Sequence, residues 1–263
     1  MSIDIESYRR QLEPFADLGV LSAWVAGSHM HGLADSQSDV DLKVIVAPTA
    51  SDILLQKADW VRPLHSPDVT VMTPIPFMRQ LVKGSPVTLE TLTVSPTMIL
   101  TDHGLLTALR AYAGLLTTSR TLDMALRNAR ANMHILDRRS DLSDRKRRKM
   151  VAETLRLFAG IDAIREGGAW PACLPFHESL LRGVRDGSIQ IDRNGLDDLY
   201  GEAERTVERL GVIEYSNETR EQVEALFADL MRRIVDSRQE TTPITVLSGL
   251  LGDWAERNGI RRV

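Results

Sequence analysis

The hydrophobic pattern of the chain changes near Leu105, and this change limits the folds that the chain can adopt. Before that point the apolar residues gather in short runs, whereas after it they recur at helical spacing over long stretches. Short runs predict strands, and the later spacing predicts helices. We therefore expect an α+β protein with two domains, residues 1–110 and residues 111–263, the second of them mostly helical.

Three short segments predict strands. Residues 20–26 are an apolar run that ends at Gly27, as a buried strand that leads into a turn would. Residues 40–46 alternate, so apolar side chains lie on one face and Asp39, Asp41 and Lys43 on the other. Residues 69–72 form the third, with Asp68 at its entrance.

Helical spacing covers much of the remaining chain. It predicts helices over residues 7–18, 77–92 (broken at Gly84 to Pro86), 105–116, 120–138, 143–166, 196–210, 217–238 and 246–255.

Charge and cysteine content exclude several classes of protein. The formal net charge is −4, which disfavours a protein that coats nucleic acid without sequence preference. The single cysteine, Cys173, leaves no internal disulfide partner and excludes a zinc site built on cysteines, so we expect a cytoplasmic protein. No apolar run approaches the roughly 18 residues of a membrane span, and we expect no membrane contact.

The segment between the first two predicted strands carries the chemistry. Asp39 and Asp41 are two residues apart in a predicted strand, so their carboxylates point the same way and repel each other unless a proton or a cation intervenes. Magnesium relieves that repulsion, because it binds one or two carboxylates and keeps positions for substrate phosphates. Gly27 allows a close backbone approach, and the amide and hydroxyl of Ser28 can donate to phosphate oxygens.

This string, Gly27-Ser28, Gly32 and Ser38-Asp39-Val40-Asp41, resembles the signature of the DNA polymerase beta superfamily of nucleotidyltransferases, in its stand-alone branch. The resemblance implies a small mixed β-sheet flanked by helices and followed by an α-helical domain. It also implies transfer of a nucleoside monophosphate from a nucleoside triphosphate, with two Mg²⁺ ions, for which Mn²⁺ is an alternative. Gly27, Ser28 and Ser38 would then contact the nucleotide.

The family also needs a third carboxylate for the catalytic metal. Asp68 fits best, since it directly precedes the third predicted strand. Asp39, Asp41 and Asp68 would then be the catalytic carboxylates and the metal ligands. Glu90 is the rival third carboxylate or a supporting residue, and its position after Gly84-Ser85-Pro86 matches the branch loosely.

Basic residues concentrate in residues 120–149, which hold ten of them against four acids. Such a stretch indicates either a face that binds phosphate or RNA, or a solvated helix with ion pairs. By the family resemblance, we expect Lys149 or Arg156 to reach the triphosphate. His29 and His31 follow Ser28, where a histidine could contact phosphate or base, but both are interpreted as helix-surface residues.

The sequence therefore predicts a metal-dependent nucleotidyltransferase. Its acceptor is a hydroxyl of RNA, protein or a small molecule, and RNA would bind through residues 120–149. The alternative is a catalytically silent module of the same fold that binds a nucleotide or a partner.

Overall fold

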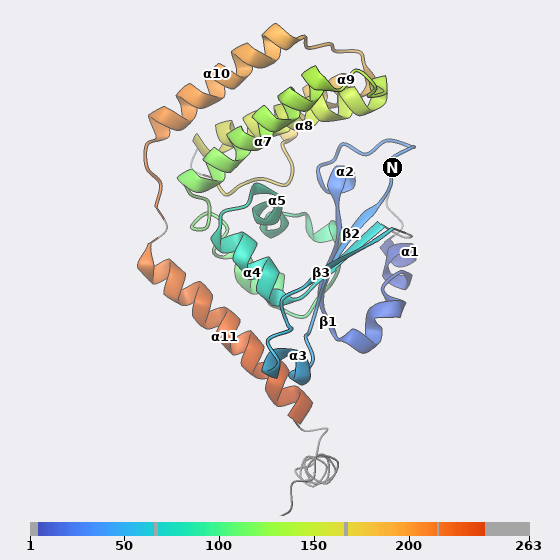
Figure 1. The fold of residues 1–263 in the computed structure, drawn as a ribbon, viewed down its shortest axis with the longest axis vertical. Coiled ribbons are helices and arrows are strands. Elements are labelled where there is room, and N and C mark those ends of the chain that lie inside the picture. Colours follow the sequence, from blue (N-terminus) through green and yellow to red (C-terminus); the bar gives the residue numbers. More distant parts are fainter. Residues whose placement is uncertain (1–4, 66–67, 166–167, 215, 240–263) are drawn as a thin grey trace, which may run out of the picture.

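The computed structural model describes residues 5–65, 68–165, 168–214 and 216–239, and Figure 1 shows how they are arranged. A sheet built from the first part of the chain lies below a group of long helices from the second part. No helix among the described residues is long and apolar enough to span a membrane.

The sheet has five strands in the order β3-β4-β2-β1-β5. β2 and β4 run parallel, whereas β1 is antiparallel to β2 and β5, and β3 is antiparallel to β4. The sheet is therefore mixed, and the expected α+β class is confirmed. The strands are β1 (Val20–Ala26), β2 (Asp41–Val46), β3 (Val61–His65), β4 (Asp68–Met72) and β5 (Ile99–Asp102).

All three predicted strands are present, and two more were missed. β1 has the predicted bounds, while β2 begins at Asp41, one residue later than predicted. The missed β3 contains Pro63, which lacks a backbone N–H and is tolerated because β3 lies at the edge of the sheet. The missed β5 is the other edge strand and has only four residues.

Short helices connect the strands, and long helices follow them. In the first part they are α1 (Ile5–Arg10), η1 (Glu13–Leu18), α2 (Gly27–Met30), α3 (Ala50–Leu54), α4 (Pro74–Val82), α5 (Pro86–Leu89), η2 (Glu90–Leu92) and η3 (Pro96–Met98). In the second part they are α6 (Leu105–Arg110), α7 (Ser119–Arg138), α8 (Asp144–Arg165), η4 (Pro175–His177), α9 (Glu178–Asp186), α10 (Arg193–Leu210) and α11 (Asn217–Gln239).

Most of the predicted helices agree with these bounds. The expected break at Gly84 separates α4 from α5, and residues 7–18 are divided into α1 and η1. Helices α3 and α9 were not predicted, because each is short and contributes little periodic signal. The helix predicted over residues 246–255 lies outside the described residues.

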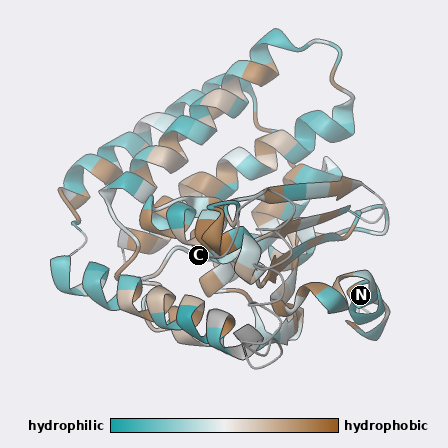
Figure 2. Cartoon of the chain, turned by 60° about the horizontal axis from the view of Figure 1, so that its bottom comes forward, coloured by the Kyte–Doolittle hydropathy of each residue, from teal (hydrophilic) through white to brown (hydrophobic). Residues whose placement is uncertain are grey.

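Strand alternation gives each face of the sheet its own apolar core. On one face, Val25 of β1, Val44 of β2 and Val71 of β4 pack with residues of α1 and η1. On the other face, Trp24 and Ile45 join a larger core built with the helices. In Figure 2 the hydrophobic segments gather where the helices meet the sheet. Polar side chains that share this second face are therefore presented to the helical region.

Helix α8 is the centre of the helical region and contacts α7, α9 and α10. Its first two turns are polar and largely exposed, whereas residues such as Ala152 and Ile161 further along are buried. Trp24 of the sheet and Ile161 of α8 belong to one continuous core, so no break in packing marks residue 110. The division into two domains stays a prediction.

Candidate active site

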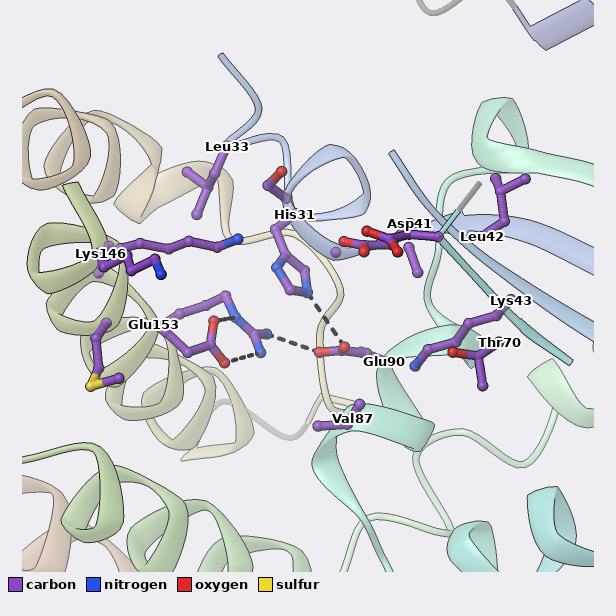
Figure 3. A pocket seen from close by; sticks show the side chains of 18 of the residues that line it. His31, Leu33, Asp41, Leu42, Lys43, Thr70, Val87, Glu90, Lys146 and Glu153 are labelled. Carbon is purple, nitrogen blue, oxygen red and sulfur yellow. Dashed lines mark hydrogen bonds and ion pairs between the residues drawn. The ribbon is translucent and has the colours of Figure 1, made fainter. Parts of the chain in front are cut away.

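A cavity of about 670 Å³ lies between the sheet and α8. Figure 3 shows side chains from β2, α2, the α5–η2 segment and α8 converging on it. Of the predicted site residues, those that line the cavity are Gly27, Ser28, Asp41, Asp68, Lys149 and Arg156. Asp39 and Ser38 do not line it.

Two carboxylates form the acidic side of the cavity. Asp41 is the first residue of β2 and Asp68 the first of β4, and these strands are neighbouring and parallel. Leu42 pairs with Val69, so the two aspartates precede equivalent positions in adjacent strands, and neighbouring strands are about 4.8 Å apart. Both aspartates therefore face the helical region, although they are 27 positions apart in the sequence.

Gly27 is required at its position for two independent reasons. Its φ angle is +62°, in the left-handed region that favours glycine. A Cβ atom placed on Gly27 would lie 2.1 Å from Oδ2 of Asp41, so any larger residue would displace that carboxylate. The close approach predicted at Gly27 was that of a ligand, whereas in the structure the Asp41 carboxylate approaches it.

The two predicted serines have different surroundings. Ser28 is buried in α2 and lines the cavity. Ser38 lies in the loop before β2, where its hydroxyl donates to Oδ1 of Asp35 and accepts from the Asp35 amide, both at 2.9 Å. These bonds make Ser38 a loop-stabilising residue in this structure, and its contact with a nucleotide stays a prediction.

Asp39 lies outside the strand that was expected to orient it. β2 begins at Asp41, so the alternation of the strand does not extend back to Asp39, whose side chain is exposed. The structure thus brings Asp41 and Asp68 together at the cavity but does not bring Asp39 with them. A role for Asp39 at the metal stays a prediction.

Lys43 faces the cavity from the same side of β2 as Asp41, two residues further along the strand. Its side chain is half-buried and lies beside Thr70 and Glu90 in the view of Figure 3. Burial lowers the pKa of Lys43, and the charges of Glu90 and Asp41 counteract part of this effect. Its amine therefore offsets some of the negative charge on the acidic side. Sequence reasoning placed it on the correct face but gave it no role.

Glu90 and Arg156 form a buried ion pair in the cavity wall, with exposed side-chain fractions of 3% and 2%. Nη1 of Arg156 donates to Oε2 of Glu90 at 2.9 Å, and its Nε and Nη2 donate to the two carboxylate oxygens of Glu153 at 2.9 and 2.8 Å. Burial alone would raise the pKa of Glu90, but Arg156, His31 and Lys43 together hold it below its ordinary value. Glu90 and Glu153 raise the pKa of Arg156 against the opposing effect of burial.

This pairing bears on two predictions. All three kinds of guanidinium nitrogen in Arg156 are bonded to carboxylates, so the contact of Arg156 with a triphosphate stays a prediction. Glu90 is bonded to an arginine rather than open beside Asp41 and Asp68. That arrangement suits a supporting residue better than a third metal ligand.

The basic stretch is divided between ion pairing and the cavity. In its last segment, residues 145–149, all three arginines are bonded to protein oxygens: Arg145 to Asp35 and Gln37, Arg147 to the carbonyls of Leu136 and Arg139, and Arg148 to the carbonyl of Arg185. The two lysines of the same segment, Lys146 and Lys149, line the cavity. Neither lysine side chain makes a hydrogen bond or an ion pair with a residue that the structure describes. They are therefore available to an anionic ligand.

The carboxylates suit a magnesium ion that arrives with phosphate. Within the described ranges, no group of three or more His, Cys, Asp or Glu side chains is arranged to hold a metal ion. Asp41 and Asp68 supply two carboxylates at an open cavity, which is the number that Mg²⁺ takes when phosphate and water complete its octahedron. The residues therefore fit a metal bound together with a nucleotide, and not a metal held by protein alone.

Sequence reasoning missed several residues of this site. His31 was interpreted as a helix-surface residue, with contact to phosphate or base as the alternative, and its side chain is 11% exposed and lines the cavity. Glu153 and Arg185 also line it, and no motif marked them. The Glu90–Arg156 pair joins residues 66 positions apart, so no local pattern predicts it.

Comparisons with known proteins add little to this geometry. No protein-family model and no curated protein matches the chain. Among solved structures, it resembles a nucleotidyltransferase-like protein from Exiguobacterium sibiricum 255-15, with 12% sequence identity and a TM-score of 0.31. The match covers 78% of this chain and 74% of that one. A structural similarity this weak supports no conclusion about activity.

Proposed function

We propose that this chain is a metal-dependent nucleotidyltransferase that moves a nucleoside monophosphate from a nucleoside triphosphate to a hydroxyl acceptor. One observation carries the proposal: Asp41 and Asp68, from neighbouring parallel strands, face the same cavity as Ser28 and the two lysines of α8. Carboxylates for a cation thus lie opposite hydrogen-bond donors for an anion. A triphosphate complexed with magnesium requires both.

The size of the cavity supports a nucleotide rather than a free phosphate. At about 670 Å³ it falls within the range of roughly 300–1,000 Å³ that is usual for small-molecule sites. Apolar side chains, among them Leu33, Val87 and Met150, also line it. They offer surface for a base or sugar beyond the charged groups.

In this proposal Asp41 and Asp68 hold the metal ions, and Asp39 joins them on the basis of the sequence pattern. Bound there, magnesium would neutralise phosphate charge and activate the acceptor hydroxyl. Gly27 keeps space for the Asp41 carboxylate, and its replacement would move that carboxylate.

The other donors position the triphosphate. Ser28 offers a hydroxyl, while Lys146 and Lys149 offer ammonium groups that can follow the phosphates as they bind. Most of the catalysis in phosphoryl chemistry comes from positioning and charge neutralisation, so these residues need no proton transfer of their own.

A catalytically silent module that binds a nucleotide is the second candidate. The observation that favours it is the position of Asp39 outside the cavity, because it leaves there only two of the three carboxylates predicted to bind metal. Such a module would bind a nucleoside triphosphate and release it unchanged.

Incubation of the protein with labelled nucleoside triphosphates separates the two candidates. Total RNA, total protein and a small-molecule pool serve as acceptors, with and without Mg²⁺, and Asp41→Asn serves as the inactive control. Transfer of label that requires Mg²⁺ and is absent in Asp41→Asn supports the enzyme and identifies the acceptor class. Tight nucleotide binding without transfer to any pool supports the silent module instead.

A further inference from the structure

His31 occupies a fixed place at the edge of the cavity. It directly follows α2, and its backbone N–H donates to the carbonyl of Gly27 at 3.1 Å, which ties it to the turn that carries Ser28. Figure 3 shows its ring directed toward Glu90, with Asp41 and Lys146 on either side in this view. His31 therefore lies among the residues proposed to hold the triphosphate.

One nitrogen of this ring faces Glu90. Nε2 of His31 is buried and lies 3.4 Å from Oε1 of Glu90, within the range of an ion pair, but it makes no hydrogen bond with a described residue. Glu90 is paired with the guanidinium of Arg156, which favours its carboxylate form. A carboxylate at this distance favours a proton on Nε2 and leaves Nδ1 for a ligand.

Glu90 in turn cannot turn away from the ring. Its second oxygen accepts from Arg156, and Arg156 is fixed by both oxygens of Glu153. The series Glu153, Arg156, Glu90 and His31 thus runs from α8 to α2 through η2. It links the helical region to the turn of the sheet at the point where the cavity opens.

Charges of both signs surround the ring. The charged groups that line the cavity are Asp41 and Lys43 from β2, Asp68 from β4, Glu90 from η2, Lys146, Lys149, Glu153 and Arg156 from α8, and Arg185 from α9. They comprise four acids and five bases, so their formal charges nearly cancel. Entry of a polyphosphate adds negative charge and favours the doubly protonated imidazolium.

We propose that His31 is a direct ligand of the triphosphate and that Glu90 is the residue that positions its ring. One imidazolium N–H faces Glu90, and the other donates to a phosphate oxygen. This inference rests on the proposed function, and it assigns roles to two residues that the carboxylate motif does not include. His31 then completes a donor set with Ser28 and Lys146.

Nuclear magnetic resonance of the imidazole nitrogens tests the contact without any transfer reaction. The ¹⁵N-labelled protein is titrated with inorganic tripolyphosphate at a pH where the free ring of His31 is neutral. We expect both nitrogens of His31 to move to the similar shifts of an imidazolium. His29 does not line the cavity and serves as the internal reference, with signals that stay in place.

Matched variants test the same contact by affinity. Hydrogen bonds to charged groups are strong, so His31→Gln is expected to weaken tripolyphosphate binding about tenfold. His29→Gln should change it less than twofold. Glu90→Gln should leave the ring in place but reduce the proton uptake that accompanies binding.

The outcomes separate this inference from the proposed function. Tripolyphosphate that binds without moving the His31 signals overturns the inference and leaves the nucleotide site intact. If His31→Gln does not fold, the titration of the unaltered protein still decides. Failure of both tripolyphosphate and nucleoside triphosphates to bind would overturn the proposed function as well.

Discussion

The two sides of the cavity differ in how they are built. The strand side presents Asp41 and Asp68 at the starts of β2 and β4, where the backbone itself fixes their direction. The α8 side presents Lys146 and Lys149 from the first two turns, which are largely exposed, on long flexible side chains. The strand side is therefore suited to a fixed metal geometry, whereas the helix side can follow phosphates of different length.

The same contrast explains why the sequence predicts the charged groups of one side better than those of the other. Alternation in a strand predicts direction, so the faces of β2 followed from the sequence. In the basic stretch, fewer charged side chains are available to a ligand than the sequence contains, because Arg145, Arg147 and Arg148 are bonded to protein oxygens. The difference between the two sides leads to four tests, ordered from the largest expected effect to the smallest.

Breaking the buried ion pair in the cavity wall should have the largest effect. Arg156→Ala leaves Glu90 buried without its partner, which typically costs about 3–5 kcal/mol of unfolding free energy. Urea denaturation measures the loss. Arg220→Ala is the control, because its ion pair with Glu224 is exposed and such pairs contribute at most about 1 kcal/mol.

The double variant Glu90→Gln with Arg156→Met sharpens this test. It removes both charges and so avoids an unpaired buried charge, and it should be more stable than Arg156→Ala alone. Equal stability of Arg156→Ala and Arg220→Ala would show that the buried pair does not support the site.

On the strand side, Asp41→Asn should reduce nucleotidyl transfer by at least ~100-fold, because the metal loses a carboxylate that no neighbour replaces. Asp39→Asn is expected to do the same if the sequence pattern is correct. Circular dichroism checks that both variants fold. Near-wild-type turnover in Asp39→Asn would show that Asp39 is not a metal ligand. The same result in Asp41→Asn would contradict the proposal that Asp41 binds the metal.

On the helix side, Lys149→Ala should raise the Michaelis constant for the nucleotide roughly tenfold and change kcat less, because it removes a contact made before and during the reaction. Lys83 lies at the end of α4, away from the cavity, and Lys83→Ala is the matched control. A fall in kcat with an unchanged Michaelis constant would instead place Lys149 at the transition state.

Arg145→Gln should have the smallest effect. Its pair with Asp35 is exposed, so the expected loss of stability is below about 1 kcal/mol. Because its charge is already paired, the salt dependence of single-stranded RNA binding should not change. A fall of about 0.7 in the slope of log affinity against log salt would show that Arg145 contacts an RNA phosphate.

The sequence was most informative where one local pattern determines the structure. The buried run of β1, the alternation in β2 and the long periods of α7, α8, α10 and α11 were all sufficient for prediction. Edge strands were harder, since β3 contains Pro63 and β5 is too short for alternation to stand out. A nine-residue helix such as α9 is hard to predict for the same reason, because it is short.

The same distinction between local patterns and tertiary packing applies to the residues of the site. Gly27, Ser28, Asp41, Asp68 and Lys149 were predicted from local motifs or strand entrances, and the structure places all of them at the cavity. The contacts of His31, Glu90 and Arg156 depend on how α2, η2 and α8 meet, which is set by packing of the whole core. Spacing within one segment carries no information about such contacts.

Nucleotide-dependent metal binding tests the central claim most directly. Electron paramagnetic resonance measures free Mn²⁺ in the presence of a non-hydrolysable nucleoside triphosphate, for the unaltered protein and for the double variant Asp41→Asn with Asp68→Asn. Asp186→Asn, outside the cavity, is the control. We predict that the unaltered protein and the control bind Mn²⁺ only with nucleotide, and that the double variant loses this binding. Equal Mn²⁺ binding by the double variant and the unaltered protein would contradict the proposal that β2 and β4 together hold the metal.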